Sequence, residues 1–466
     1  MKVLSLFDGM ACGMLAMMDA GFAIDRYVAF EIDKYAVQTS SHNFHMIEHR
    51  GDVFQADFKE FYGFDLLIGG SPCTYWSIAQ KNNRETVASG MGWELFSQYV
   101  RALHEAKPKL FIYENNKSMS GAIRASIDEA FGFEAVCINS ALVSAQNRQR
   151  LYWVGKRNED GTYSRVDVSQ PEDRGILLRD ILESGDGPGF KELSEREMEY
   201  MVRETRDGRN HFDFDHHHDA TKEKSACLTA NTHKGVPYNV LCEPICVAER
   251  GRYEDGTIVQ RFEARLDGKS NVLTTVQKDN NVAEPVRVGT WPNNAKNQAH
   301  DSQQYRIYSA DGKSVTLCGN GGGMGAKTWL YAIPVEFDGN SPIKAVSCAD
   351  GKTYTVYKVD GGQITIKDKQ YPIKLPDGFY IIRKLTVREC MRLQTVPEWF
   401  EFPVSDAQAY KMLGNGWTVR VIAHLLQHIP QESNKANDRF EELCASIDRI
   451  IERLERIEKH MQEVAM

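Results

Sequence analysis

The sequence lacks any apolar run that approaches the roughly 20 residues of a membrane-spanning helix, so we expect no membrane span. The apolar stretch KVLSLF follows Met1 at once, which leaves no room for a cleaved signal peptide. The ten cysteines are spread singly, except for Cys242 and Cys246, and no second pair stands at zinc-like spacing. We therefore expect mostly free thiols in a reducing, cytoplasmic environment and no metal centre.

Two ligand-binding signatures are also missing. The glycine spacing of the first loop does not match G-x-G-x-x-G, which disfavours a nicotinamide oxidoreductase. The stretch NGGGMGAKT (320–328) has Ala326 where a phosphate-binding loop needs glycine, so we interpret it as a mobile loop, with DNA contact as the alternative hypothesis. Consecutive histidines in FDFDHHHDA (212–220) cannot all face one ion, and we interpret them as a solvated loop.

The chain also has fewer basic than acidic residues, 56 against 64. The formal net charge is −8, which weighs mildly against a nucleic-acid partner. The argument is weak, because phosphates respond to local charge and a basic cleft can occur on an acidic protein.

Residues 1–157 alternate short apolar strands with helical stretches, which predicts an α/β domain with a largely parallel sheet. The stretches expected to form strands are KVLSLF, RYVAFEI, LLIGG, KLFIYEN, VCINSALV and RLYWVG. Ligands of such sheets bind at the carboxyl ends of the strands. Residues 158–380 are rich in Gly, Asn, Asp and Thr, which predicts a largely β module.

A weak repeat runs through this module. The copies KSACLTA, KSNVLTT and KSVTLCG begin at Lys224, Lys269 and Lys313. The repeat predicts either loops used for recognition or plain hairpins without a function of their own.

A helical pattern returns over residues 381–430, and a different one fills 431–466. In that last segment, apolar residues recur at alternating steps of three and four: Phe440, Leu443, Ile447, Ile450, Leu454, Ile457, Met461 and Val464. This heptad stripe predicts a helix that either forms a homodimer as a coiled coil or docks on its own chain.

The first loop, LFDGMACGM (6–14), follows a strand, and Gly9 and Gly13 allow a ligand to approach the backbone. Glu31 follows the second strand, where an acid typically bonds a ribose hydroxyl. Asp52 closes the third strand-like element. Each acid alone could equally cap a helix or a turn, but the three features in this order predict a nucleoside-bearing cofactor.

A single cysteine stands at the end of another strand, in LLIGGSPC. Pro72 restricts the backbone before Cys73, and the preceding glycines leave room for a flat ligand. Alone, such a cysteine more often packs as a small apolar residue. Its surroundings favour a nucleophile that adds to an electron-poor ring. The residues expected to meet at this rim are Glu114, Asn115, Gln146, Arg148 and Arg150, the last three on alternate positions of AQNRQR.

The motif order GGSPC, YENN, AQNRQR, RKLTVRECMRLQTVP and GNGWTV resembles the cytosine-C5 DNA methyltransferases. The match covers about 1–157 and 381–430. The loop LFDGMACGM and the tryptophan of GNGW resemble the animal de novo enzymes, whereas the rest resembles bacterial or phage enzymes. The resemblance implies a Rossmann-like methyltransferase sheet, an inserted target-recognition domain over 158–380 and double-stranded DNA as substrate.

The resemblance also implies a mechanism. Cys73, after Pro72, would add as a thiolate to C6 of a cytosine that has been flipped out of the duplex. Glu114, beside Asn115, would supply the proton that balances the addition. Arg150 would steady the base carbonyl or Glu114, and Arg148 would hold a backbone phosphate.

The implied cofactor is S-adenosyl-L-methionine, which becomes S-adenosyl-L-homocysteine. The residues implied to line its site are Phe7, Asp8, Gly9, Met10, Glu31, Ile32, Asp52, Val53, Asn415 and Trp417. Two positions depart from the family pattern: Ala11 replaces a glycine of the common loop, and Asn116 stands where valine is usual. Neither change removes a chemical group that the reaction needs.

Two other functions compete with a DNA (cytosine-5-)-methyltransferase. A transfer-RNA cytosine methyltransferase shares these motifs, but the long insert favours a sequence-specific enzyme for duplex DNA. A non-catalytic DNA-binding relative would not need Cys73, Glu114 and Arg150. Neither the target sequence nor a cognate restriction endonuclease can be derived from one chain. We expect the run from Leu385 to Pro397 to be a structural core helix.

Overall fold

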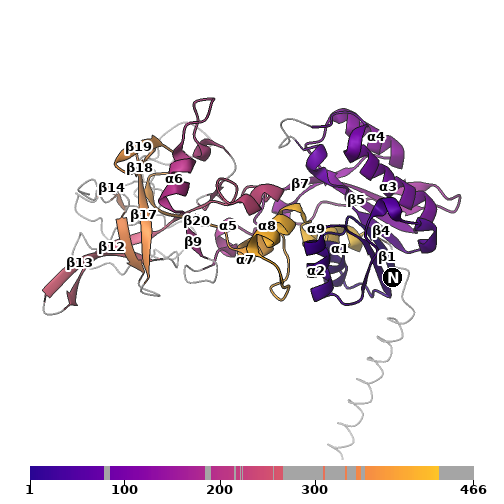
Figure 1. Cartoon of the computed structure of the whole chain (residues 1–466), viewed down its shortest axis with the longest axis horizontal. Helices are drawn as coiled ribbons and strands as arrows, with labels where there is room; N and C mark the ends of the chain where they lie inside the picture. Colours follow the sequence, from indigo (N-terminus) through magenta and orange to yellow (C-terminus); the bar gives the residue numbers. More distant parts are fainter. Residues whose placement is uncertain are drawn as a thin grey trace, which may run out of the picture.

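The computed structural model describes residues 1–77, 84–183, 190–214, 217–220, 222, 224–254, 257–265, 308–309, 331–332, 343–347 and 352–429. Two lobes lie along the long axis of the molecule, with helices α7 and α8 between them (Figure 1). None of the helices in these ranges is long and apolar enough to cross a membrane. The stretch NGGGMGAKT, the second and third repeat copies and the heptad stripe lie outside the described residues.

The first lobe contains a sheet with the order β3-β2-β1-β4-β5-β7-β6, and β8 pairs with β7. Its strands are β1 (Lys2–Leu6), β2 (Arg26–Phe30), β3 (Ile47–His49), β4 (Leu66–Gly69), β5 (Leu110–Asn116), β6 (Val136–Asn139), β7 (Gln149–Arg157) and β8 (Tyr163–Arg165). The pairs from β3 to β5 are parallel, whereas β7 runs antiparallel to β5, β6 and β8. The predicted α/β fold with a largely parallel sheet is confirmed.

Helices cover both faces of this sheet, because successive side chains of a strand point to opposite sides. On β1, Val3 joins the apolar cluster that contains residues of α1 and α9, while Leu4 and Leu6 join the cluster that contains residues of α3 and α4. The helices of the two layers are α1 (Cys12–Asp19), α2 (Lys34–Asn43), α3 (Gly90–Ala106), α4 (Gly121–Phe131) and α9 (Val419–Gln427). With both faces buried, the strands read as continuous apolar runs.

The C-terminal helices lie against the first lobe. Helix α9 packs its apolar residues into the same cluster as α1, although the two helices are far apart in sequence. Helices α7 (Val387–Leu393) and α8 (Asp406–Asn415) precede it. Thr386 caps α7 and forms a reciprocal capping box with Glu389, so the expected structural role of the Leu385–Pro397 run fits the fold.

The second lobe contains a largely β sheet with the order β10-β11-β20-β17-β16-β13-β12, to which β9, β18 and β19 are attached. Its strands are β9 (Lys191–Glu192), β10 (His218–Asp219), β11 (Leu241–Pro244), β12 (Cys246–Glu254), β13 (Thr257–Arg265), β16 (Ile343–Ser347), β17 (Thr353–Asp360), β18 (Gln363–Ile366), β19 (Lys369–Pro372) and β20 (Gly378–Lys384). Strands β14 (Tyr308–Ser309) and β15 (Tyr331–Ala332) pair with each other. Helices α5 (Leu178–Ile181) and α6 (Glu195–Val202) also lie in the 158–380 segment.

The structure moves both predicted boundaries of the inserted segment. The first boundary, after residue 157, is too early, because β8 adds to the catalytic sheet and Leu178 and Ile181 lie in its core cluster. The second, before residue 381, falls inside β20, which runs from Gly378 to Lys384 in the other sheet. The residue composition of the sequence changes at these points, but strand pairing decides which lobe a segment joins.

The histidine-rich stretch is not a solvated loop where the structure describes it. His218 and Asp219 form β10 and are only 1% and 4% exposed. His218 Nδ1 lies 2.8 Å from Ser225 Oγ, and burial lowers the pKa of His218 to about 3. Parallel pairing of β10 with β11 buries this segment, which its polar composition did not indicate.

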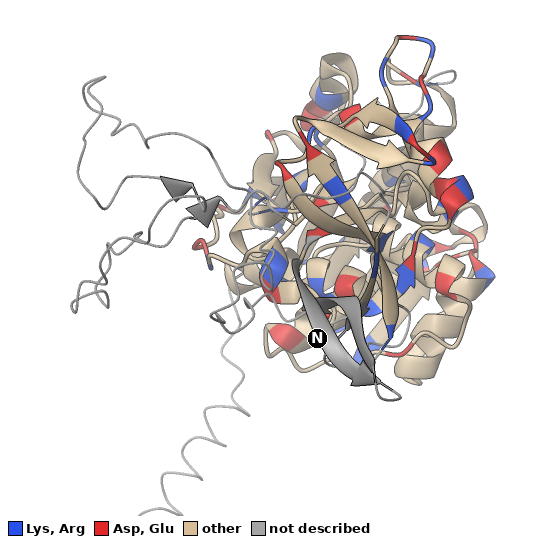
Figure 2. Cartoon of the chain, turned by 90° about the vertical axis from the view of Figure 1, so that its left-hand side faces the viewer, with Lys and Arg blue, Asp and Glu red and all other residues tan. Residues whose placement is uncertain are grey.

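A buried charge network joins the two lobes where β20 leads into α7. Arg383 is fully buried and donates two hydrogen bonds to Glu389, at 2.9 and 2.8 Å. Its Nε donates to Glu243 on β11 at 2.7 Å. Figure 2 shows that acidic and basic residues are otherwise interspersed over the described ribbon. A buried guanidinium paired with two carboxylates is costly to disturb, because removing it leaves both acids without their partner.

We therefore expect Arg383→Met to lower the free energy of unfolding by about 3–5 kcal/mol. Urea unfolding monitored by tryptophan fluorescence measures this change. Lys367→Met is the matched control, because it removes a solvent-exposed cation that pairs with Glu199, and it should leave stability nearly unchanged. Equal effects of the two substitutions would contradict the structural role of Arg383.

Candidate active site

Cys73 lies in a tight turn at the carboxyl end of β4. The strand ends at Gly69, and a single 3₁₀ turn, Cys73–Tyr75, follows with Pro72 as its N-cap. Gly70 must lack a side chain, because a Cβ there would stand 2.8 Å from the Glu114 carbonyl oxygen. This close approach places the cysteine turn against the end of β5, the parallel neighbour of β4.

Side chains from β5 hold the backbone of this turn. Asn115 Nδ2 donates to the Ser71 carbonyl oxygen at 3.1 Å, and Asn116 Nδ2 donates to the Cys73 carbonyl oxygen at 3.3 Å. The Tyr113 hydroxyl lies 2.7 Å from Ser71 Oγ. Asn116, where valine is usual, thus adds a hydrogen bond to the backbone of the cysteine itself.

Glu114 is 8% exposed, and both of its carboxylate oxygens have a partner. Arg150 Nε lies 3.1 Å from Oε1, and Trp417 Nε1 donates to Oε2 at 2.9 Å. Arg150 comes from β7, whose antiparallel pairing with β5 sets Arg150 opposite Asn116. The structure therefore brings Cys73, Glu114 and Arg150 to one rim of the sheet, as predicted.

Burial sets the proton affinity of this rim. It raises the pKa of Glu114, against the opposing charges of Arg150 and Arg148 and the Trp417 hydrogen bond. It also raises the pKa of the Cys73 thiol, which Arg150 lowers and Glu114 raises. Burial therefore makes both groups harder to ionise, and Arg150 opposes that effect at each of them.

Arg148 does not lie where the phosphate-binding role placed it. Its side chain is buried and donates to the carbonyl oxygens of Leu228 at 2.7 Å and Gly416 at 2.9 Å, with Gly414 at 3.3 Å. Because backbone carbonyls occupy these donors, Arg148 ties the inserted segment to the end of α8. Gln146 is similar: it donates to the Leu393 carbonyl at 3.1 Å.

One residue near the site was missed in the sequence. Cys227, in the first repeat copy, is half-buried, and its sulfur lies 3.4 Å from Arg148 Nη1. That copy is no hairpin here, since Ser225 bridges to Gln146 of the arginine motif. The repeat drew attention to KSACLTA, but nothing in the sequence linked this cysteine to the arginines.

The first glycine loop surrounds a buried acid. Asp8 Oδ1 accepts hydrogen bonds from Ser5 Oγ at 2.5 Å and Tyr27 Oη at 2.7 Å. Its Oδ2 is buried without a hydrogen-bond partner among the described residues, and burial raises the pKa of Asp8 to about 6. Gly9 has a φ of 60°, with open space where a Cβ would stand, and its N–H donates to Glu31 Oε2 at 2.8 Å. Among the described residues, the loop thus offers a buried carboxyl with one unpartnered oxygen next to open backbone.

Ala11 adopts a left-handed φ of 68°, which explains why glycine is common there in the family pattern. Phe7, beside Asp8, also has a positive φ, of 58°. Met10 is buried, and a Cβ on Gly416 would meet its Cε at 3.5 Å. The loop therefore packs on the C-terminal return, the segment of residues 381–429 that follows the inserted segment.

The residues that follow strands β2 and β3 include one exposed apolar side chain and one acid. Ile32 is 77% exposed, directly after Glu31. Asp52 accepts a hydrogen bond from the Phe54 N–H at 3.0 Å, which makes it the N-cap of a 3₁₀ turn. The Val53 side chain is buried in the aromatic core cluster, so only its backbone can face a cofactor.

The C-terminal return contributes differently at its two predicted positions. Asn415 is exposed at the end of α8. Trp417 was predicted only for the cofactor site, but its side chain also donates a hydrogen bond to Glu114. Tertiary folding therefore places Trp417 on Glu114, directly after Gly416, which packs near Met10.

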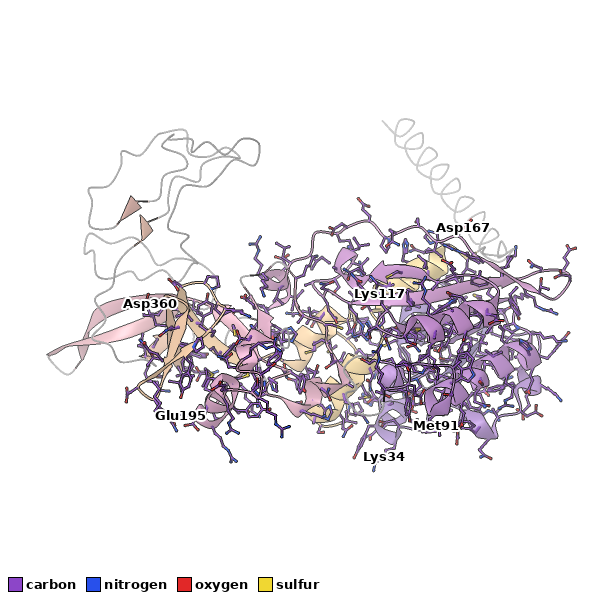
Figure 3. The ribbon with its side chains drawn as sticks, turned by 90° about the horizontal axis from the view of Figure 1, so that it is seen from above. Lys34, Met91, Lys117, Asp167, Glu195 and Asp360 are labelled. Atoms are coloured by element: carbon purple, nitrogen blue, oxygen red, sulfur yellow. The ribbon has the colours of Figure 1, made fainter. Side chains whose placement is uncertain are left out.

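A cavity of about 370 Å³ opens beside Arg150. Its lining residues are Asn116, Lys117, Ser118, Gln149 and Arg150. Lys117, labelled on the first lobe in Figure 3, donates to Gln149 Oε1 at 2.6 Å. Lys117 and Arg150 place two cations on the lining of this cavity, which suits an anionic ligand. Among the described residues, no group of three or more His, Cys, Asp or Glu side chains could hold a metal ion.

The raised pKa of Asp8 predicts how the ligand-free protein responds to pH. The folded protein binds the proton more tightly than the unfolded chain, so stability falls as pH rises from about 4 through about 6. Between about pH 4.5 and about pH 7.5 this amounts to about 2 kcal/mol, and Asp8→Asn should remove it. Urea unfolding at both pH values measures the difference, and Asp19→Asn, on the exposed side of α1, should keep the wild-type dependence.

Comparison with known proteins gives the site its context. The family model for C-5 cytosine-specific DNA methylases matches residues 1–431. The orphan methyltransferase M.SPRI of Bacillus phage SPR is 25% identical, over 92% of this chain and 97% of the relative. The type II methyltransferase M.HhaI of Haemophilus parahaemolyticus is 22% identical, over 93% and 95%.

Solved structures with a similar chain course include the Entamoeba histolytica methyltransferase EhMeth, at a TM-score of 0.48 and 11% identity, covering 92% of this chain and 97% of that one. The S. pombe Dnmt2 methyltransferase has a TM-score of 0.46 at 14% identity, covering 91% and 96%. The family match spans nearly the whole chain, including both parts of the divided catalytic lobe. The chain belongs to the C-5 cytosine-specific DNA methylase family, and it is a DNA (cytosine-5-)-methyltransferase.

Proposed function

We propose that this enzyme methylates C5 of a cytosine flipped out of a specific double-stranded DNA sequence, through a covalent bond between Cys73 and C6. The observation that carries the proposal is the rim where Glu114 lies between Arg150 and Trp417, beside the Cys73 turn. A cytosine stacked inside a duplex could not reach a nucleophile held this close to the sheet, so the base must leave the stack.

The chain's own groups account for the addition. The Cys73 thiolate forms a bond to C6, while Glu114 gives its proton to N3, so C5 gains nucleophilic character. Burial favours the protonated form of Glu114 that this step needs. Arg150 lowers the pKa of Cys73 and orients Glu114. After methyl transfer, a base removes the C5 proton and elimination frees Cys73.

Bound S-adenosyl-L-methionine would supply the methyl group, and the residues of the glycine loop fit it. The unpartnered Asp8 oxygen suits a cationic ligand, and the open backbone at Gly9 allows close approach. Exposed Ile32 offers an apolar surface for a flat ring. We propose that Glu31 and Asp52 bond the ribose and the adenine amine, and that Phe7, Met10, Val53, Asn415 and Trp417 complete the site.

The second lobe is the proposed target-recognition domain for DNA. Its sheet joins the catalytic lobe through the segment that contains Ser225 and Leu228, close to the arginine motif. Relatives that include phage and bacterial enzymes support action on DNA in the cytoplasm of a bacterial or phage-infected cell. A homodimer through residues 431–466 and a cognate restriction endonuclease remain predictions.

The test is base-resolution mapping of 5-methylcytosine in a methylation-free bacterial host that expresses the protein. We expect methylation at one recurring short sequence, and its complete loss in Cys73→Ala, because the substitution removes the sulfur that adds to C6. Cys137→Ser, a cysteine on β6, is the matched control and should methylate like the wild type.

A second readout tests the covalent step. Duplex DNA that carries 5-fluorocytosine at the mapped site should form a denaturation-stable complex with the wild type and none with Cys73→Ala. If the DNA of the host stays unmodified while its transfer RNA is methylated, the proposal of a DNA substrate is wrong and RNA is the substrate.

A further inference from the structure

The cavity that opens beside Arg150 has no role in the mechanism above. Of the five residues that line it, Lys117 and Arg150 are cationic and none is acidic. The other three, Asn116, Ser118 and Gln149, carry amide or hydroxyl groups. The lining therefore combines positive charge with neutral hydrogen-bonding groups, a composition that suits an anion.

The pairing of β5 with β7 brings the lining residues together. β5 ends at Asn116, which lies opposite Arg150, so their chain neighbours Lys117 and Gln149 also meet. Lys117 Nζ donates to Gln149 Oε1 at 2.6 Å. With this oxygen engaged, the amide nitrogen of Gln149 remains as a further hydrogen-bond donor.

The two cations differ in how far their charge is already balanced. Arg150 Nε lies 3.1 Å from Glu114 Oε1, and Arg150 Nη1 donates to the Gln149 carbonyl oxygen at 2.9 Å. Lys117 is exposed, and within the described part of the chain its partner is the neutral Gln149 and not a carboxylate. The charge of Lys117 is therefore available to an anion from outside the chain.

Two contacts connect this cavity with the reacting groups. Asn116 donates to the Cys73 carbonyl oxygen at 3.3 Å, and Arg150 pairs with Glu114. A cytosine flipped toward these groups stays bonded to its sugar–phosphate backbone, so the phosphates that flank it must lie close by. Arg148 was the residue expected to hold such a phosphate, but backbone carbonyl oxygens take its donors.

We propose that the cavity binds one backbone phosphate next to the flipped cytosine, with Lys117 as its cation and Gln149 holding the lysine in place. This inference rests on the proposed function, because it needs a flipped cytosine at Cys73. An ammonium donates charge-assisted hydrogen bonds to phosphate oxygens, and such contacts position DNA without reading its sequence.

The carboxylate of the cofactor is the other anion of this reaction, and the order of the sheet argues against it. The glycine loop follows β1, whereas the cavity lies where β5 ends and β7 begins. β4, which leads into the Cys73 turn, lies between β1 and β5. The proposed cofactor loop and the cavity are therefore on opposite sides of the nucleophile.

The test measures the Kd for a duplex that carries the mapped site, with S-adenosyl-L-homocysteine present, at several salt concentrations. We expect Lys117→Met to raise the Kd about tenfold and to lower the slope of log Kd against log salt by about one, because one phosphate contact is lost. Lys117→Arg keeps the charge and should keep the wild-type slope.

Lys109→Met is the matched control. Lys109 directly precedes β5, at the opposite end of the strand from Lys117, and it is exposed and pairs with Asp65 at 3.0 Å. Its loss should leave both the Kd and the salt slope at the wild-type values, because this end of the strand faces away from the catalytic edge of the sheet.

A second measurement changes the DNA and leaves the protein intact. Single phosphates on either side of the target cytosine are replaced by uncharged methylphosphonates. At one of these positions the wild type should lose about tenfold in affinity, and Lys117→Met should lose almost nothing further, because the two changes remove the same contact. The affinity for S-adenosyl-L-homocysteine without DNA, measured by calorimetry, should be equal in the two proteins.

Three results would overturn the inference while the wild type still methylates DNA. These are an unchanged salt slope in Lys117→Met, methylphosphonate losses that are equal in both proteins at every position, and a loss of affinity for S-adenosyl-L-homocysteine in place of DNA. The last result would assign the cavity to the cofactor carboxylate. A wild type that leaves DNA unmethylated would instead overturn the proposed function, and the phosphate site with it.

Discussion

The ion pair between Arg150 and Glu114 is the contact on which the active site depends. Both residues lie on adjacent strands, β5 and β7, and burial would force the carboxyl to stay neutral if no cation faced it. With Arg150 on one oxygen and Trp417 on the other, the carboxyl has a fixed orientation, and both contacts oppose the rise in its pKa that burial causes. Such a carboxyl fits the proton-donor role proposed for Glu114.

The rest of the fold brings distant segments to this pair. Helix α9 packs with α1 on one face of the sheet, and this places Trp417 next to Glu114 and Gly416 on Met10. Arg148 holds the end of α8 by its carbonyls, and a Cβ on Gly414 would meet the Thr229 carbonyl oxygen at 2.0 Å. The inserted lobe, the C-terminal return and the catalytic sheet are therefore one packed unit around the site.

Departures from the family pattern have local explanations. Ala11 occupies a left-handed backbone position at which glycine is less strained, and α1 begins directly after it. Asn116 replaces an apolar residue by an amide that bonds the Cys73 carbonyl oxygen. The role expected of Arg148 from the resemblance is not the one that its contacts show, because backbone carbonyls take its donors before a phosphate could.

The sequence by itself determined the α/β class, most strands of the first sheet, the glycine loop and the meeting of Cys73, Glu114 and Arg150 at one rim. These are local properties: apolar periodicity makes a strand, and a polar residue just past its carboxyl end reaches the rim. Only the tertiary structure decided that Trp417 meets Glu114, 303 residues away, and that Cys227 meets Arg148, 79 residues away. Spacing along the chain carries no record of such contacts, because they arise when strand pairing and helix packing fold remote segments onto one buried charge.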